Sequence, residues 1–222
     1  MKALLFGLRE CLLDPDVQSV VSIGRTALGR SHPKLREIVQ ADITDLAARA
    51  DELRGYDACF FCLGVSSAGM TEPDYRRVTH DLTLAVARTL AALNSGLTFI
   101  YVSGAGTDGT ERGRSMWARV KGQTENALLR LPFKAAYMFR PGFIQPLHGI
   151  TSRTKLYRII YGMTRPLMPV LKVLLRGQIL TTEQIGRAMI NAVRRGAPHA
   201  VLEIRDLHAL ATDAASPAAS AR

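Results

Sequence analysis

Several features that mark whole classes of proteins are missing from this chain of 222 residues. No apolar stretch approaches the ~20 residues that a membrane-spanning helix needs, and the apolar run at the N-terminus is too short for a signal peptide. Cysteine is scarce: Cys11, Cys59 and Cys62 form an odd, irregularly spaced set, which argues against a disulfide framework. We therefore expect a cytoplasmic protein with one domain over residues 1–210.

Metal and redox sites also lack a sequence signal. Cys59 and Cys62 have C-x-x-C spacing, but they fall in an apolar run that is typical of a buried strand. Residues three apart on a strand point to opposite faces of the sheet, so we expect core packing and no metal. The last residues, 211–222, are rich in alanine and serine, and we expect a disordered tail there.

Acidic residues are absent from one long segment. The chain carries a net charge of +10, and between Glu125 and Glu183 it has basic residues but no Asp or Glu. Such a segment attracts anions, which include a phosphorylated cofactor and an anionic membrane surface, unless it is only a solvated basic face. Residues 153–176 mix apolar and basic side chains, which allows weak contact with an anionic membrane. We find no motif for specific nucleic-acid binding.

What the chain does contain is a regular alternation of apolar strands and amphipathic helices. Strands are expected at 2–6, 19–23, 35–39, 57–63, 97–102, 134–139 and 199–204. Helices are expected at 45–53, 73–94, 114–131 and 182–195. Thr44 is expected to cap the first of these helices, and Thr181 or Thr182 the last. The alternation predicts an α/β fold with a doubly wound parallel sheet, and residues 142–180 are expected to cover a substrate cleft.

The residues that follow the strands are the candidate ligand contacts, because ligands bind outside the carboxyl ends of the strands in such folds. Arg25 follows the second strand, where an arginine suits a 2′-phosphate and favours NADP over NAD. Asp42 and Ile43 follow the third strand and could flank an adenine. The fourth strand ends at Leu63, Gly64 and Val65, and Gly64 allows close approach of the backbone. The candidate contacts at these three strand ends, which share one edge of the predicted sheet, are Arg25, Asp42, Ile43, Leu63, Gly64 and Val65.

The segments 99–108 and 117–125 resemble the short-chain dehydrogenase/reductase superfamily, and most closely its atypical, NAD-dependent epimerase/dehydratase-like branch. The resemblance extends from the first strand through Arg140, Pro141 and Gly142 to the helix around Gly186. It implies an NAD(P)-binding Rossmann fold, with NADP as the favoured cofactor and NAD as the alternative. It also places Pro141 and Gly142 at the cofactor.

The same resemblance implies a catalytic Ser-Tyr-Lys triad that is incomplete here. Lys121 matches the lysine, which in the family holds the nicotinamide ribose and lowers the tyrosine pKa. Trp117 stands in the tyrosine position, and an indole cannot transfer that proton. Ser103 lies near the serine position, although Ala105 is an alternative match. Trp117 and Phe143 are expected to line the substrate pocket.

The family pattern also places a glycine-rich phosphate loop after the first strand, and this sequence has no such loop. Gly7 leads directly into Leu8 and the residues of a helix end, so that roughly nine residues are lacking against the pattern. A deletion, a gene-model error or an incomplete sequence would each leave this arrangement. The pyrophosphate would lose backbone amides that normally bind it, and Gly7 is the remaining candidate contact.

Three functions are compatible with these features. The first is an NADP-dependent oxidoreductase that acts on a small carbonyl or hydroxyl compound. The second is a non-catalytic nucleotide-binding regulator or scaffold, which the tryptophan at position 117 favours. The third is a peripheral membrane or quinone-linked assembly protein, which depends on residues 153–176. The substrate and the oligomeric state do not follow from the sequence.

Overall fold

The computed structural model describes residues 1–5, 9–147 and 178–212. Its centre is a seven-stranded sheet in the order β3-β2-β1-β4-β5-β6-β9, with parallel pairing throughout. The strands are β1 (Lys2–Leu5), β2 (Ser19–Gly24), β3 (Leu35–Val39), β4 (Ala58–Phe61), β5 (Thr98–Val102), β6 (Ala135–Arg140) and β9 (Val201–Glu203). This order is that of a doubly wound nucleotide-binding sheet, so the predicted fold class is confirmed.

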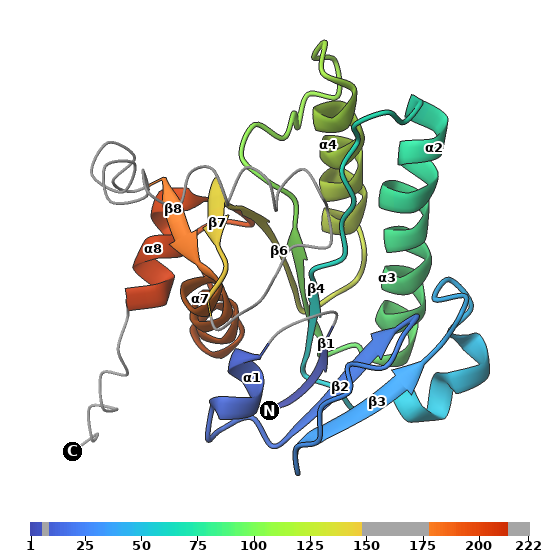
Figure 1. The fold of residues 1–222 in the computed structure, drawn as a ribbon, viewed down its shortest axis with the longest axis vertical. Helices are drawn as coiled ribbons and strands as arrows, with labels where there is room; N and C mark the ends of the chain where they lie inside the picture. Colours follow the sequence, from blue (N-terminus) through green and yellow to red (C-terminus); the bar gives the residue numbers. More distant parts are fainter. Residues whose placement is uncertain (6–8, 148–177, 213–222) are drawn as a thin grey trace.

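Helices cover both faces of the sheet (Figure 1). On one face lie α2 (Glu72–Arg76), α3 (Leu82–Leu93), α4 (Met116–Leu129) and the 3₁₀ helix η1 (Ala47–Leu53); on the other lie α1 (Glu10–Leu13), α7 (Thr182–Arg195) and α8 (Ile204–Thr212). Successive residues of a strand pack into the hydrophobic clusters on opposite faces of the sheet, because side chains alternate across a sheet. Phe60 packs towards α7 and α8, whereas Phe61 packs towards α3.

The first crossover is short but closes the parallel pairing. Ala3 of β1 pairs with Val20 of β2 and with Ala58 of β4, which places β1 in the middle of the sheet. Helix α1 has only four residues and packs against α7. Arg194 of α7 holds this corner by ion pairs with Asp14 and with Asp16, the latter at 2.9 Å.

Several predicted elements need correction. Thr44 does not cap the helix after β3: η1 begins at Ala47, and the Thr44 hydroxyl instead donates to Asp42 at 2.6 Å. The predicted helix over 73–94 begins one residue earlier and contains a π-helical segment, η2 (Arg77–Asp81), between α2 and α3. The predicted cap of the last long helix is confirmed, because Thr181 accepts from Gln184 N in a full capping box.

The C-terminal part departs most from the prediction. The final strand is shorter than expected, and α8 follows it directly up to Thr212, beyond the predicted start of the tail at residue 211. Residues 213–222 lie outside the described residues, as does most of the predicted cleft cover. The two ends of the predicted cleft cover form a small parallel strand pair, β7 (Phe143–Gln145) with β8 (Ile179–Thr181).

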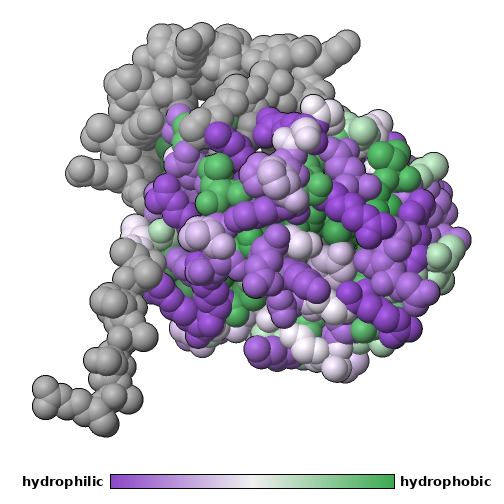
Figure 2. All heavy atoms as spheres, turned by 90° about the horizontal axis from the view of Figure 1, so that it is seen from below, coloured by the Kyte–Doolittle hydropathy of each residue, from purple (hydrophilic) through white to green (hydrophobic). Residues whose placement is uncertain are grey.

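The surface seen from below Figure 1 is mainly hydrophilic, with apolar side chains scattered among charged and polar ones (Figure 2). Among the helices that the structure describes, none combines the length and the hydropathy of a membrane span.

Candidate functional site

A pocket of about 290 Å³ opens beside α4, next to the segment that follows β4. Its walls come from three parts of the chain: the segment after β4, helix α2 and the first two turns of α4. The lining residues are Val65, Ser66, Ser67, Tyr75, Trp117 and Lys121. The structure therefore brings together three predicted residues, Val65, Trp117 and Lys121, at the sheet edge where this fold binds ligands.

The loop over 103–115 is pressed against α4 by a glycine in the helix. A Cβ on Gly122 would lie 1.8 Å from the Asp108 carbonyl oxygen, so only glycine lets the loop backbone lie this close. Asp108 N donates to Ala118 O at 3.1 Å, and the Asp108 carboxylate accepts from Gly113 N at 2.6 Å. The hydrogen bonds that the Asp108 carboxylate accepts, from the Thr110 hydroxyl first and from Gly113 N next, hold its pKa below the ordinary value.

The same loop packs against the tryptophan of the pocket. Gly106 has φ of +83°, and a Cβ there would lie 3.5 Å from the Trp117 ring. A side chain at this position would be strained by the positive φ of its backbone, and the loop lies in van der Waals contact range of the indole. The loop thus supports Trp117 from behind, and the ring forms a fixed wall of the pocket.

Lys121 carries the main functional group of the pocket. Its Nζ donates a hydrogen bond to the Ser103 carbonyl oxygen, and a Cβ on Gly104 would lie 4.0 Å from this Nζ. Burial lowers the pKa of Lys121 from 10.5 to about 8, although the negative charge of Glu125, one turn along α4, opposes this shift. An ammonium group with a pKa near 8 exchanges its proton readily close to neutral pH.

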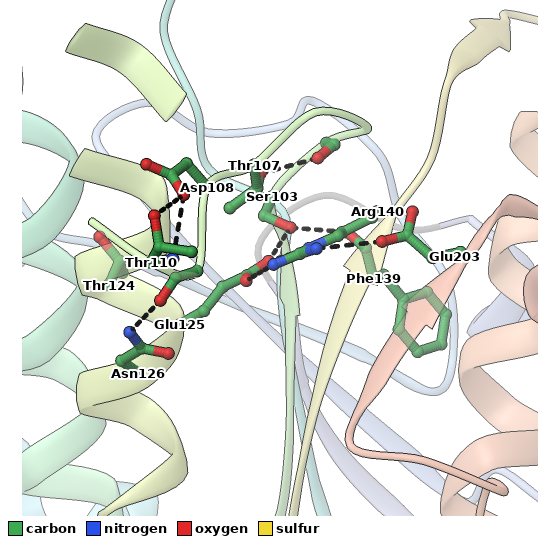
Figure 3. A network of polar contacts seen from close by, with 12 residues as sticks. Ser103, Thr107, Asp108, Thr110, Thr124, Glu125, Asn126, Phe139, Arg140 and Glu203 are labelled. Carbon is green, nitrogen blue, oxygen red and sulfur yellow. Dashed lines mark hydrogen bonds and ion pairs between the residues drawn. The ribbon is translucent and has the colours of Figure 1, made fainter. Parts of the chain in front are cut away.

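Ser103, a predicted catalytic residue, is not among the described residues that line the pocket. Its hydroxyl is buried and lies 2.5 Å from Glu125 Oε1 and 3.1 Å from the Phe139 carbonyl oxygen. Figure 3 shows the hydroxyl directed into this network between β5, α4 and β6. The backbone carbonyl of Ser103, rather than its hydroxyl, serves the site by accepting from Lys121.

Glu125 and Arg140 form a buried ion pair behind the pocket. Arg140 donates from Nε at 3.0 Å and from Nη2 at 2.5 Å to the two carboxylate oxygens, and the Glu125 side chain is 1% exposed. Arg140 Nη1 also donates to Glu203 at 3.0 Å, which links β6 to β9. The hydrogen bond to Glu125 raises the pKa of Arg140. The fork geometry fixes both side chains, so the network ties α4 to three strands.

The other predicted contacts are spread along the strand ends. Arg25 is exposed directly after β2. Asp42 is exposed and accepts from Thr44 N and Oγ1, which keeps its pKa below the ordinary value. Ile43, in contrast, is buried in the core, so its side chain is not available to an adenine. Gly7 lies outside the described residues.

Around the pocket, the remaining predicted residues have mainly structural contacts. Leu63 packs against the core, and Gly64 has open space where a Cβ would lie. Pro141 accepts from Ala105 N at 2.8 Å, and Phe143 N donates to Gln178 O at 3.1 Å. Gly142 packs so closely on Gln178 that a Cβ would lie 2.9 Å from its carbonyl oxygen.

Four residues of the site do not appear among the sequence candidates: Ser66, Ser67, Tyr75 and Glu125. Tyr75 lies in the first helix after β4, and helices that follow strand ends begin at the ligand edge of this fold. Glu125 lies four residues after Lys121, a spacing that places two helical side chains on one face. Both signals are present in the sequence.

A larger hollow of about 440 Å³ lies elsewhere, along α7, α8 and α1. Its lining includes Asp14, Gln184 and Arg187 but none of the strand-end residues. We place the candidate site in the smaller pocket, because chemistry in parallel α/β sheets occurs at the strand carboxyl ends. Within the described residues, no group of three or more His, Cys, Asp or Glu side chains could hold a metal ion.

Comparisons with known proteins agree on the fold. No model of a protein family matches the chain. Solved structures with a similar fold include the enzyme WbmF of Bordetella bronchiseptica in complex with NADH (TM-score 0.63, 16% identity, 94% of this chain and 75% of that one). Another is a UDP-glucose 4-epimerase of Thermotoga maritima (TM-score 0.62, 13% identity, 95% and 81%). At these identities the likeness shows a Rossmann-like nucleotide-binding fold.

The curated relatives are mitochondrial proteins of fungi. The chain is 26% identical over 148 residues to "Protein fmp52-2, mitochondrial" of Aspergillus terreus (65% of this chain, 62% of the relative). It is 28% identical over 145 residues to "Protein fmp52, mitochondrial" of Emericella nidulans (62% and 60%). The chain therefore spans about three fifths of the length of these relatives.

The relatives correct the expected location. Their names place them in mitochondria, so the prediction of a cytoplasmic protein is wrong. That prediction rested on the missing signal-peptide and membrane-span patterns, and neither absence distinguishes the cytoplasm from an organelle that cytoplasmically made proteins enter by other signals.

Proposed function

We propose that this protein is an NAD(P)-binding oxidoreductase of the short-chain dehydrogenase/reductase type, acting on a small carbonyl or hydroxyl compound. The observation that carries the proposal is the pocket beside β4, in which Lys121 Nζ lies with Trp117, Tyr75 and two serines. When bound, a nicotinamide dinucleotide supplies hydride transfer, and the protein supplies orientation and proton transfer.

The described residues fit the two ends of such a cofactor. The basic Lys121 and the hydroxyls of Ser66 and Ser67 offer hydrogen bonds to a ribose at one end. Arg25 and Asp42, both exposed at neighbouring strand ends, suit the adenosine end. Gly7, the residue predicted from the sequence to contact the pyrophosphate, lies outside the described residues.

Arg25 makes NADP the proposed cofactor. An exposed guanidinium binds a 2′-phosphate through paired hydrogen bonds, whereas an acidic residue at this place holds a free ribose hydroxyl. Several structures with the same fold contain NAD⁺ or NADH, so the choice of NADP for this chain depends on Arg25 alone.

The proposal is tested by calorimetric titration with NADPH and NADH. We expect NADPH to bind more tightly, and Arg25→Asp to shift the ratio of dissociation constants towards NADH by roughly tenfold or more, because a charge-assisted contact is replaced by repulsion. Arg205→Asp is the matched control, since Arg205 is equally exposed on α8 at the opposite edge of the sheet. An unchanged ratio in Arg25→Asp would remove Arg25 from the cofactor site.

A non-catalytic nucleotide-binding regulator is the second candidate, and Trp117 favours it. The indole lines the pocket at the place where the family resemblance puts the acidic tyrosine. Binding of NADPH by a folded protein, with no turnover of any carbonyl compound in a broad screen, would select this candidate.

A further inference from the structure

The pocket contains few groups that can carry a proton. Of its six lining residues, Val65, Ser66, Ser67 and Trp117 have no group that ionises near neutral pH. The two that ionise are Tyr75 on α2 and Lys121 on α4. Ser103, the other candidate of the triad, has its hydroxyl buried against Glu125 and Phe139. Among the lining residues that the structure describes, the candidate proton donors for a bound carbonyl are therefore Tyr75 and Lys121, with water as the alternative.

Burial acts in opposite directions on these two side chains. It raises the pKa of the Tyr75 phenol above its ordinary value of 10, which makes it a weaker acid. It lowers the pKa of the Lys121 ammonium to about 8, which makes it a stronger one. A proton donor is most effective when its pKa lies near the working pH, so the environment of the pocket favours the lysine.

The charges around Lys121 keep its proton available. Glu125 is the carboxylate on the same helix, but its ion pair is with Arg140 of β6 and not with Lys121. The residue that follows β5, Ser103, contributes its neutral backbone carbonyl, which accepts from Lys121. Helix α2 contributes Tyr75, which is neutral and lines the same pocket. An ammonium that is bound by a carbonyl, rather than locked in an ion pair with a carboxylate, gives up a proton more readily.

We propose that Lys121 is itself the catalytic acid of this protein, in the role that Trp117 cannot perform. The inference rests on the proposed oxidoreductase function. During reduction the carbonyl carbon receives a hydride from the reduced nicotinamide. An N–H bond of the Lys121 ammonium breaks, and its proton forms the O–H bond of the alcohol. Lys121 is left as a neutral amine and regains a proton from water, while the nicotinamide is left oxidised.

Two variants separate an acid from a simple cofactor contact. Lys121→Arg keeps a positive charge and hydrogen-bond donors for a ribose, but a guanidinium does not release a proton near neutral pH. Lys121→Met keeps much of the volume and loses both functions. Each variant is titrated with NADPH and then assayed for reduction of 4-nitrobenzaldehyde, with circular dichroism as the check of folding. Lys34→Arg is the matched control, because Lys34 directly precedes β3, at the amino end of the strand, and does not line the pocket.

We expect Lys121→Arg to bind NADPH within a few-fold of the wild type and to reduce the aldehyde at least a hundredfold more slowly at pH 7, as for loss of a general acid. The wild-type rate should fall as the pH rises through about 8, because reduction needs the protonated lysine. If Lys121→Arg retains most of the wild-type turnover, the inference is overturned and Lys121 is only a positioning residue. If the wild type binds no NADPH, the proposed function itself is wrong, and the inference about Lys121 falls with it.

A second measurement needs no activity. The lysines are reductively methylated with ¹³C-formaldehyde, and their methyl signals are followed by NMR as the pH is raised. The Lys121 signal is the one missing from Lys121→Arg. We expect it to titrate near pH 8, well before the other lysines. A Lys121 signal that titrates together with the others would overturn the inference even if the aldehyde is reduced.

Discussion

The two halves of the central sheet differ in how completely they are built as a binding site. The half around β4, β5 and β6 has a closed pocket wall, a loop fixed on α4 and a buried ion pair between Glu125 and Arg140. The half around β1, β2 and β3 has a four-residue helix after its first strand and exposed residues at its strand ends. The strand ends of β4, β5 and β6 therefore form an organised pocket, whereas the helix α1 that follows β1 is short and the residues Arg25 and Asp42 near the ends of β2 and β3 are exposed.

Gly122→Ala should have the largest effect, because it disrupts the packing of the loop over 103–115 on α4, next to the pocket. Its Cβ would lie 1.8 Å from the Asp108 carbonyl oxygen, so the loop must leave α4 or the helix must shift. We expect a loss of roughly 4 kcal/mol or more in the free energy of unfolding, the size of the severest single substitutions, measured by urea denaturation. Gly96→Ala is the control, since a Cβ there meets nothing within 4 Å. Equal stability of the two variants would contradict this account of the loop.

Glu125→Gln should come next. It leaves the buried Arg140 charge without its main partner, and breaking a buried ion pair costs about 3 kcal/mol. Glu203→Gln removes the more exposed partner of the same arginine, and we expect a loss of no more than about 1 kcal/mol. The two unfolding free energies are compared at pH 7. Similar small losses would mean that the network behind the pocket adds little to stability.

Lys121→Met should raise the free energy of unfolding of the protein at pH 7. The pKa of Lys121 is about 8 in the folded protein against 10.5 for an ordinary lysine, so the folded state opposes protonation of this group. Between those pH values the unfolded state binds more protons, and the wild type therefore becomes more stable as the pH rises. The variant should gain about 1 to 2 kcal/mol at pH 7, after the lost hydrogen bond is allowed for, and its stability should not rise between pH 8 and 10.5 from this cause. A loss of stability at pH 7 would show that the charged lysine is well accommodated.

Arg194→Ala should have the smallest effect of the four, on the less complete half. Its ion pairs with Asp14 and Asp16 join α7 to the corner after α1, and both Arg194 and Asp16 are partly exposed. Such pairs contribute about 1 kcal/mol or less. Hydrogen exchange should show faster opening of α1 with little change in β5 or α4. Uniformly faster exchange would mean that this corner is part of the main cooperative unit.

The positions and the parallel direction of the strands follow from the sequence because each is a short apolar run that both layers of helices bury. The alternation predicts β1 to β6 within a few residues. Helix α8 was missed, although its buried residues Ile204, Leu207 and Leu210 have helical spacing. The predicted strand over 199–204 included only the first residue of this helix, and residues 205–210 were assigned to no element.

The candidate site is only partly predictable. Val65, Trp117 and Lys121 reach one pocket because strand ends and helix starts share an edge of the sheet. The direction of the Ser103 hydroxyl could not be predicted, since it depends on Glu125 and on the Phe139 carbonyl, which approach only in the folded chain. The structure also assigns Ile43 to the core, where an apolar residue after a strand packs as readily as it meets a ligand.

We propose that the pocket beside Lys121 receives the nicotinamide end of a dinucleotide. Trp117 is the only tryptophan of the chain and lines that pocket, so its fluorescence reports occupancy directly. We would titrate the folded protein with NADPH and follow both the Trp117 emission and energy transfer to the reduced nicotinamide. We expect NADPH to quench the Trp117 emission saturably, with energy transfer to the reduced nicotinamide. The same result is expected for Lys121→Arg. Unchanged Trp117 emission up to millimolar NADPH would contradict this proposal.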